Sequence, residues 1–195
     1  MQIVPAILTA DLSEARRLLE EVSQSARFGR VQFDFIDGEY ANNLTIKPED
    51  VDLTPFLGME FDAHLMVVEK NIDEYVKQSE RVGFDRIIVQ AESVSDLENY
   101  SGLALDIHSP LEALEKYLPR LEVVVLMAIE PGFGGQEFNE EVIDRAKYLV
   151  DLRDKNGWKY KVQIDGGVQQ EHLEVLEKAG ADEVVVGAKR VLEWK

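Results

Sequence analysis

The sequence predicts an α/β protein built as a lean (β/α)8 TIM barrel, and three observations point to this fold. Eight short apolar runs recur along the 195 residues, and nearly every run is followed by a helical pattern. The connections are short and the composition does not change along the chain, so residues 1–195 are expected to form one domain. Glycine bends follow the last three runs, and barrels that bind phosphate typically use these late loops.

The predicted strands are rich in apolar and β-branched residues and are bounded by turn-forming residues. They comprise residues 2–8, 31–36, 59–67, 86–89, 103–107, 121–127, 160–164 and 183–186. An open doubly wound sheet is the alternative arrangement. It is disfavoured because the first turn lacks Gly-x-Gly-x-x-Gly and because the glycine bends come late in the chain.

Capping residues mark where several helices are expected to begin. Asp11 can cap the first helix, with Glu14 completing a capping box. Thr54-Pro55 predicts a short helix, and Ser109-Pro110 predicts another that reaches about residue 117. Further helical patterns cover residues 75–82, 142–150 and 170–179. The last helix, within residues 189–195, has room for only about two turns.

The composition restricts the classes of partner and of site. Thirty-eight acidic and 21 basic residues give a net charge of −17, which opposes binding to nucleic acid or to an anionic membrane surface. We therefore expect backbone amides, rather than a basic surface, to hold any phosphate. The sequence has no cysteine, so disulfides and thiolate sites are excluded. No apolar run approaches the ~18 residues of a membrane span and no leader pattern begins the chain, which predicts a cytoplasmic protein.

Three glycine bends follow predicted strands. The longest lies in residues 129–138, Ile-Glu-Pro-Gly-Phe-Gly-Gly-Gln-Glu-Phe, between an apolar run and a helical pattern. The others are Asp165-Gly166-Gly167 and Gly187-Ala188. Glycine lets backbone N–H groups approach an anion closely, and the amino terminus of a helix adds unpaired donors and a favourable dipole. The bends are candidate phosphate loops, although simple structural turns use the same residues.

Side-chain alternation along the strands places polar residues inside the barrel. Gln32 and Asp34 share one face of their strand, opposite two phenylalanines that suit packing against helices. By the same count, His64 and Asp165 point inward near the carboxyl ends of their strands. A buried charge is costly unless it is paired or bound to metal. Asp34, His64 and Asp165 are therefore expected to converge on one divalent cation or one substrate.

Simpler structural roles are alternatives for several of these residues. An aspartate at the end of a strand is often only the cap of the next helix, as Asp37 and Asp165 can be. A histidine on a sheet is commonly a hydrogen-bonded core residue, but two carboxylates facing His64 favour a ligand. His108 is expected in a loop and His172 on a solvated helix face.

Six motifs follow one another over nearly the whole chain, from residue 5 to residue 188. They are Pro5-Ala6-Ile7-Leu8-Thr9-Ala10-Asp11, Asp34-Phe35-Ile36-Asp37-Gly38, Asp62-Ala63-His64-Leu65-Met66-Val67, Leu126-Met127 through Pro131-Gly132-Phe133-Gly134-Gly135-Gln136, Asp165-Gly166-Gly167 and Val186-Gly187. Together, and in this order, they resemble the ribulose-phosphate 3-epimerase family. The His-Leu-Met and Pro-Gly-Phe-Gly-Gly-Gln blocks are specific to that family and to closely related epimerases.

The resemblance implies a metal-assisted isomerase that converts D-ribulose 5-phosphate to D-xylulose 5-phosphate by inverting the carbon next to the ketone. Asp34 and Asp165 match the acid/base pair, which also ligates the metal, and His64 matches a third ligand. One carboxylate would remove the proton, the other would return one on the opposite face, and the cation would stabilise the enediolate between them. The residues that match substrate- and phosphate-binding positions are Met66, Met127, Gly132, Gly134, Gly135, Gln136, Gly166, Gly167, Gly187 and Ala188. The resemblance also implies a homo-oligomer and a place in the pentose phosphate pathway.

The chain departs from the family pattern at five positions. Gln32 stands where the family has its remaining histidine ligand, and Ala6 stands where it has a serine that contacts substrate. Ile36 replaces a methionine, Gln90 a histidine and Ala188 a serine. A glutamine oxygen is a harder and weaker donor than imidazole, which favours manganese or magnesium over zinc, with iron as a further option.

These departures leave three hypotheses. The first is an epimerase of a ketose phosphate, with ribulose 5-phosphate as the expected substrate and a hexulose 6-phosphate as an alternative. The second is a non-catalytic homologue that binds a sugar phosphate, which Gln32 and Ala6 motivate. The third is another barrel lyase or isomerase that acts on a phosphorylated sugar.

Overall fold

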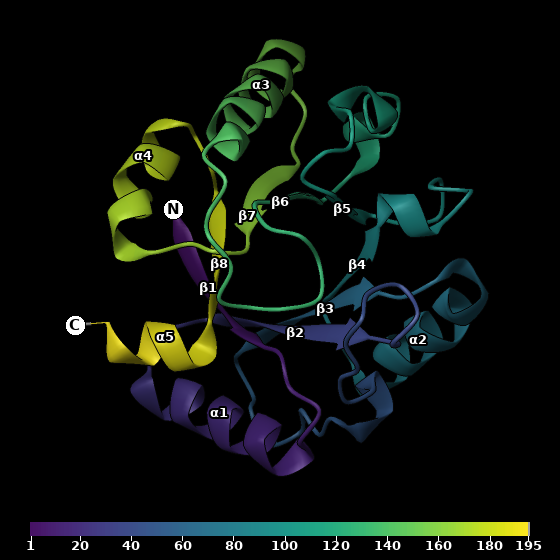
Figure 1. Ribbon diagram of the computed structural model, residues 1–195, viewed down its shortest axis with the longest axis vertical. Helices are drawn as coiled ribbons and strands as arrows, with labels where there is room; N and C mark the ends of the chain where they lie inside the picture. Colours follow the sequence, from purple (N-terminus) through teal and green to yellow (C-terminus); the bar gives the residue numbers. More distant parts are fainter. Residues whose placement is uncertain (195) are drawn as a thin grey trace.

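A computed structural model describes residues 1–194, in which eight parallel strands close into a barrel in chain order (Figure 1). The strands are β1 Gln2–Ile7, β2 Arg30–Ile36, β3 Glu60–Met66, β4 Arg86–Gln90, β5 Gly102–Leu105, β6 Val123–Met127, β7 Lys161–Asp165 and β8 Glu183–Gly187. All eight predicted strands are confirmed, with ends that differ by at most two residues. Pairing of β1 with β8 closes the barrel and excludes the open doubly wound sheet.

Within residues 1–194, five α-helices lie around the barrel, and short 3-10 helices fill other connections (Figure 1). The α-helices are α1 Leu12–Ser25, α2 Glu69–Val82, α3 Glu141–Asn156, α4 Leu173–Lys178 and α5 Ala188–Glu193. The 3-10 helices are η1 Pro48–Asp50, η2 Ala91–Ser93, η3 Leu111–Ala113, η4 Leu118–Arg120 and η5 Gln170–His172. No helix within residues 1–194 combines the length and the apolarity that a membrane crossing needs.

Two predicted helices are wrong. Thr54-Pro55 forms a turn, because the Asp52 carboxylate accepts hydrogen bonds from both the backbone and the hydroxyl of Thr54, which leaves that hydroxyl committed to the turn. The segment after Ser109-Pro110 forms only the 3-10 helices η3 and η4. The backbone hydrogen bonds of residues 110–117 run mainly from residue i to residue i−3, as in a 3-10 helix, and Pro119 prevents an α-helix from continuing beyond them.

The cap of α1 is only partly as predicted. The Asp11 carboxylate accepts hydrogen bonds from the backbone N–H groups of Ser13 at 2.8 Å and Glu14 at 3.2 Å, as an N-cap should. The Glu14 carboxylate does not close the capping box. It accepts from the Thr9 hydroxyl at 2.5 Å and pairs with Lys189 at 2.6 Å, so it joins α1 to α5.

The alternation predicted for β2 is confirmed. Phe33 and Phe35 point outward and both meet Phe84 edge to face, with ring centroids 5.8 and 5.6 Å apart. Gln32 and Asp34 point into the barrel and are buried there. The apolar outer face thus packs against the surrounding elements and fixes which side chains reach the interior.

A buried ionic network closes the amino-terminal end of the barrel. We call it the barrel-floor network, and it consists of Arg30, Asp62, Arg86, Lys161 and Glu183. The Arg86 guanidinium donates to Asp62 from Nε at 2.9 Å and to Glu183 from Nη2 at 2.7 Å. Lys161 reaches Glu183 at 2.6 Å, and Arg30 donates to Asp62. Each buried carboxylate therefore has two cationic partners, and the opposite end of the barrel is left for the site.

Candidate active site

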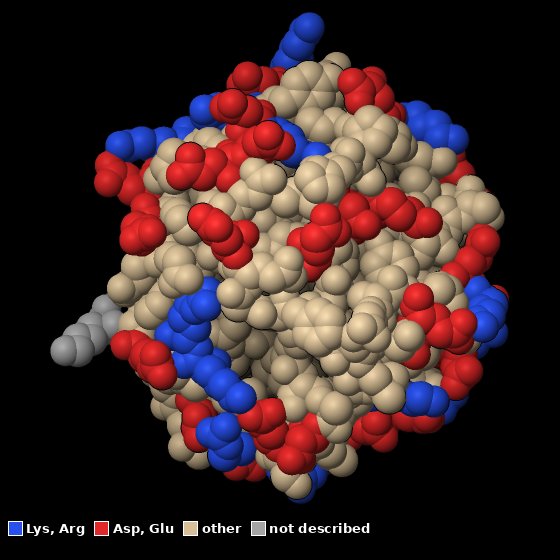
Figure 2. Space-filling view, viewed as in Figure 1, with Lys and Arg blue, Asp and Glu red and all other residues tan. Residues whose placement is uncertain are grey.

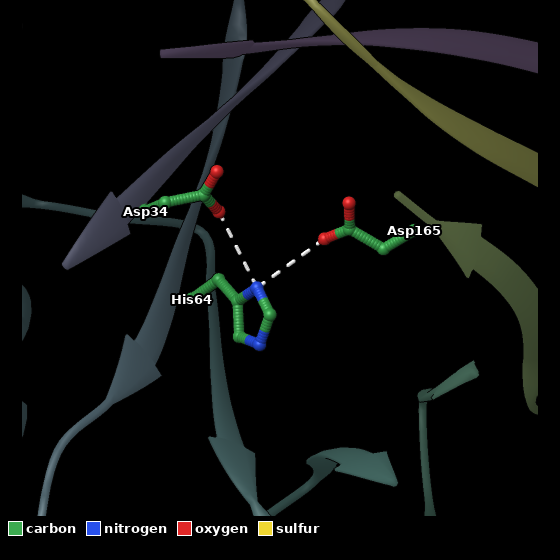
Figure 3. Close-up of side chains that lie close together, drawn as sticks. All are labelled: Asp34, His64 and Asp165. Carbon is green, nitrogen blue, oxygen red and sulfur yellow. Dashed lines mark ion pairs between the residues drawn. The ribbon is translucent and has the colours of Figure 1, made fainter. Parts of the chain in front are cut away.

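Three predicted residues meet at the carboxyl ends of the strands. Asp34 from β2, His64 from β3 and Asp165 from β7 surround one small space (Figure 3). His64 Nδ1 lies 3.3 Å from Asp34 Oδ1 and 3.3 Å from Asp165 Oδ2, and all three side chains are buried. Their donor atoms lie within 4.8 Å of one another, so the group could hold a metal ion.

Gln32 completes the ring of polar groups around this space. Its Nε2 donates to Asp34 Oδ1 at 2.8 Å and to Asp165 Oδ2 at 2.7 Å, and it lies 3.3 Å from His64 Nδ1. Its Oε1 is buried and has no hydrogen-bond partner among residues 1–194. The glutamine is therefore in the position of a fourth ligand. Turning its amide over would present the oxygen to the same space.

Burial and charge shift the proton affinities of this group. Burial raises the pKa of Asp34 and the charge of Asp165 raises it further, although hydrogen bonds from His64 and Gln32 act in the opposite direction. Burial lowers the pKa of His64, but the hydrogen bonds and charges of Asp165 and Asp34 outweigh burial and raise it to about 9. A carboxyl group with a raised pKa suits proton transfer near neutral pH.

Gln90 from β4 holds the far side of the His64 ring. The Gln90 amide nitrogen lies 3.0 Å from His64 Nε2, and Gln90 Oε1 is buried without a partner in the described part of the chain. With the amide turned over, Oε1 accepts the Nε2–H proton of His64. With Nε2–H held in this way, an incoming metal that displaced the Nδ1 proton would find the Nδ1 lone pair facing Asp34 and Asp165, as a metal ligand requires.

A cavity of about 410 Å³ opens above Asp34 and Asp165. Met66 and Met127 form part of its wall, and Ala6 lies on the β1 side. The other predicted binding residues that line it are Gly132, Gly134, Gly135, Gly166, Gly167, Gly187 and Ala188. Gln136 differs, because its amide donates to the Glu130 and Phe133 carbonyls of its own loop and the residue does not line the cavity.

The turn after β7 requires glycine. Gly166 and Gly167 adopt φ angles of 104° and 68°. A Cβ atom on Gly166 would lie 2.3 Å from the Ile129 side chain, and one on Gly167 would lie 2.9 Å from the Phe138 backbone. At this turn the backbone of Gly166 and Gly167 lines the cavity with no side chain covering it.

The long glycine bend folds across the mouth of the barrel between β6 and α3 (Figure 1). The Asn43 amide donates to the Gly132 carbonyl at 2.6 Å and ties this bend to the loop after β2. The sequence placed the bend directly before a helix. Two further residues, 139 and 140, instead separate it from α3, so the amino terminus of that helix does not directly follow the glycines.

Residues outside this group have structural roles. Asp37 is not the cap of the next helix that one alternative proposed, because its carboxylate accepts from the backbone N–H groups of Glu39 and Tyr40 in its own loop and from that of Val68, which lies before α2. His108 lies in an exposed loop, as predicted. The prediction for His172 is wrong, because its side chain is largely buried and stacks on Phe138 with ring centroids 4.2 Å apart.

Asp106, an acidic residue whose charge interacts with that of His64, was not recognised from the sequence. Asp106, directly after β5, accepts a hydrogen bond from the Tyr40 hydroxyl at 3.0 Å. Burial, followed by the charge of Glu92, raises the pKa of Asp106 from its usual 3.8 to about 6. Nothing in the local sequence distinguishes this aspartate from a solvated one, since its neighbours come from distant segments.

Replacing Asp106 with asparagine should stabilise the protein in a pH-dependent way. The raised pKa means that the stability from the protonated Asp106 is present below pH 3.8 and is lost as the pH rises through 6. Asparagine is neutral throughout and still accepts from Tyr40. After a discount for partial exposure, we expect a gain of about 1 kcal/mol at pH 8 and almost none at pH 4. Urea unfolding at both pH values measures this, with the exposed Asp151→Asn as control; a destabilised D106N protein at pH 8 would contradict it.

Comparison with known proteins places this geometry in a family. A family model described as "Ribulose-phosphate 3 epimerase family" matches residues 2–191. Ribulose-phosphate 3-epimerase from Synechocystis sp. is 32% identical over 201 residues, covering 95% of this chain and 85% of that protein. The Bacillus subtilis protein of the same name is 30% identical, covering 96% of this chain and 91% of its own length.

Solved structures of low sequence identity share the fold. Phosphoribosyl anthranilate isomerase from Thermotoga maritima superposes with a TM-score of 0.61 at 14% identity, covering 96% of this chain and 88% of that one. The tryptophan synthase complex from Pyrococcus furiosus gives a TM-score of 0.63 at 16% identity, covering 96% and 87%. The barrel is thus common to several enzymes, whereas the sequence matches are specific. The chain belongs to the ribulose-phosphate 3-epimerase family, a family of isomerases.

Proposed function

We propose that this protein is a metal-assisted 3-epimerase that interconverts D-ribulose 5-phosphate and D-xylulose 5-phosphate. The observation that carries the proposal is the convergence of Asp34, His64 and Asp165 under a cavity lined by the glycine bends. The cavity volume of about 410 Å³ falls within the usual range for small-molecule sites. The name of the curated relatives supports the same substrate.

Two carboxylates that approach one carbon from different sides can invert its configuration. Asp34 and Asp165 come from strands β2 and β7, and both face the space above His64 (Figure 3). One carboxylate would take the C3 proton, so that the C–H bond breaks and its electron pair enters the enediolate. The other, in its acid form, would donate a proton to the opposite face of C3. The raised pKa of Asp34 favours the proton-carrying state that this exchange needs.

The donor set fits a divalent cation held by Asp34, His64 and Asp165, with Gln32 as a fourth ligand. The partnerless Gln32 Oε1 and the position of His64 Nδ1, 3.3 Å from a carboxylate oxygen of both Asp34 and Asp165, support this fit. When bound, such a cation supplies positive charge to the developing enediolate oxygens. Three oxygen donors and one nitrogen donor favour manganese, magnesium or iron over zinc.

Gln32→His should raise the affinity for zinc by about tenfold or more, because imidazole is a better zinc ligand than an amide oxygen. Manganese affinity should change much less. Competition with a chromophoric chelator measures both constants. Gln32→Leu is the matched control, since it removes the donor and should weaken both metals; equal zinc affinity in all three proteins would contradict the role of Gln32.

Conversion of ribulose 5-phosphate, followed by NMR in the presence of manganese or magnesium, tests the proposed reaction. We expect xylulose 5-phosphate to accumulate, chelator to stop the reaction and added metal to restore it. A hexulose 6-phosphate in a parallel assay tests the alternative substrate. Absence of any epimer with metal-loaded protein would reject the proposal.

A non-catalytic sugar-phosphate-binding protein is the second candidate function. Gln32 favours it, because its Nε2 satisfies both carboxylates through hydrogen bonds without any cation. In that case ribulose 5-phosphate would raise the melting temperature but would not be converted. Turnover that disappears in Asp34→Asn and Asp165→Asn would exclude this candidate.

A further inference from the structure

Two basic residues line the cavity above Asp34 and Asp165, in a chain whose net charge is −17. They are Lys189 and Arg190, at the start of α5. Three carboxylates line the same cavity, from Asp34, Glu130 and Asp165. A phosphate dianion entering this cavity would meet mostly negative side chains, unless cations close to its binding place compensate for them.

Lys189 and Arg190 are adjacent to two glycine bends at once. They directly follow Gly187-Ala188, the bend after β8. Arg190 Nη1 also donates to the carbonyl of Val168 at 3.3 Å, and Val168 directly follows the Gly166-Gly167 turn. Figure 2 shows Lys and Arg atoms in a strip beside a hollow on this face, over the start of α5. The two cations therefore border the part of the cavity formed by bare backbone.

Neither cation is tightly committed to a carboxylate. Lys189 pairs with Glu14 at 2.6 Å, but 65% of the Lys189 side chain is exposed, and exposed ion pairs contribute little to stability. Glu14 would keep its hydrogen bond from the Thr9 hydroxyl if Lys189 moved away. Arg190 forms no ion pair within the described residues, and its one hydrogen bond leaves other guanidinium N–H groups available.

We propose that the side chains of Lys189 and Arg190 form a cationic clamp for the phosphate of the ligand, with Glu14 holding Lys189 when the clamp is empty. This inference rests on the proposed function in one respect, that the ligand carries a phosphate monoester. It departs from the expectation from composition that backbone amides, rather than basic groups, hold the phosphate, because it adds two side-chain cations to those amides. The planar guanidinium suits two phosphate oxygens, and the flexible ammonium adds a second charge.

Titration of the full chain with inorganic phosphate, followed by calorimetry, tests the clamp without any turnover. Lys189→Gln and Arg190→Gln should each weaken phosphate binding about tenfold, the usual effect of losing one hydrogen bond to a charged group. Lys147→Gln removes a comparable exposed lysine on α3, whose partner is Asp144, and should change nothing. Unchanged phosphate affinity in the well-folded Lys189→Gln protein or in the well-folded Arg190→Gln protein would overturn the proposal.

Glu14→Gln should strengthen phosphate binding, whereas Lys189→Gln and Arg190→Gln should weaken it. The glutamine can still accept from Thr9 but no longer competes for Lys189, so phosphate binding should tighten about twofold to threefold. The gain should vanish when Lys189→Gln is also present, because the two residues act through one contact. A Glu14→Gln gain that persists without Lys189 would contradict the assigned partner.

Kinetics separate failure of the clamp from failure of the proposed function. Because the clamp holds the phosphate equally in the bound substrate and in the transition state, the two glutamine variants should raise KM about tenfold and leave kcat unchanged. If the two glutamine variants bound phosphate more weakly but the unmodified protein did not epimerise the substrate, the clamp proposal would stand and the proposed enzymatic function would be rejected. If both variants turned over substrate normally with an unchanged KM, the proposed enzymatic function would stand and the clamp proposal would be rejected.

Discussion

Asp34→Asn and Asp165→Asn are each expected to lower kcat for epimerisation by about 10³-fold, within the range by which positioned acids and bases accelerate proton transfer. Asparagine keeps the size of the side chain, but its amide neither takes a proton nor gives one at neutral pH. The double variant should lose little more than either single variant, since both groups serve one proton exchange. Steady-state rates with saturating metal measure the effect.

Matched controls keep this prediction specific to the two carboxylates. Asp106→Asn changes a partly buried aspartate that does not line the cavity, so its kcat should stay within a few-fold of the unmodified protein. Metal content and thermal melting must be recorded, because Asp34 and Asp165 also belong to the metal-binding group. A single variant that keeps a tenth of the activity under these conditions would refute the two-carboxylate mechanism.

The second large effect is expected at the other end of the barrel, in Asp62→Asn. The Asp62 side chain is fully buried and receives hydrogen bonds from Arg30 and Arg86. Neutralising it leaves two buried guanidinium groups with too few partners. The expected loss in the free energy of unfolding is about 3–5 kcal/mol, as for other broken buried ion pairs. Urea unfolding monitored by circular dichroism gives this value.

Arg17→Ala provides the surface comparison for Asp62→Asn. Arg17 and Glu21 form an ion pair of 2.7 Å on α1, and both side chains are about half exposed. Losing this pair should cost at most about 1 kcal/mol. If Asp62→Asn proved as mild as Arg17→Ala, the barrel-floor network would contribute no more than a surface pair, contrary to its burial.

Periodicity predicted the strands better than the helices for a physical reason. Every barrel strand is covered on both faces, so apolar residues predominate along it and mark a run of definite length, even where a polar residue points into the barrel. The segments between strands only have to bring the chain back to the start of the next parallel strand, and several do so by turns rather than by α-helices. At Thr54-Pro55 the Asp52 carboxylate holds a turn in place of the predicted helix, and after Ser109-Pro110 the backbone bonds are mainly of the 3-10 type.

Strand parity anticipated the candidate site because alternation is strict within a strand. Parity predicted that the side chains of Asp34, His64 and Asp165 all point into the barrel. In the structure their metal-binding atoms lie within 4.8 Å of one another. Parity could not identify the partners of Asp62 or the pairing of Lys189 with Glu14. Those contacts depend on how strands and helices distant in sequence lie beside one another.

The most direct test of the two-carboxylate account is epimerisation of ribulose 5-phosphate in D₂O, with NMR or mass detection of deuterium at C3. The account predicts that each product molecule carries one solvent deuterium at C3, because the acid that donates the proton differs from the base that removed it. Xylulose 5-phosphate that retains the original C3 hydrogen would contradict the account. Metal-loaded protein that produces neither deuterium incorporation nor epimer would contradict it as well.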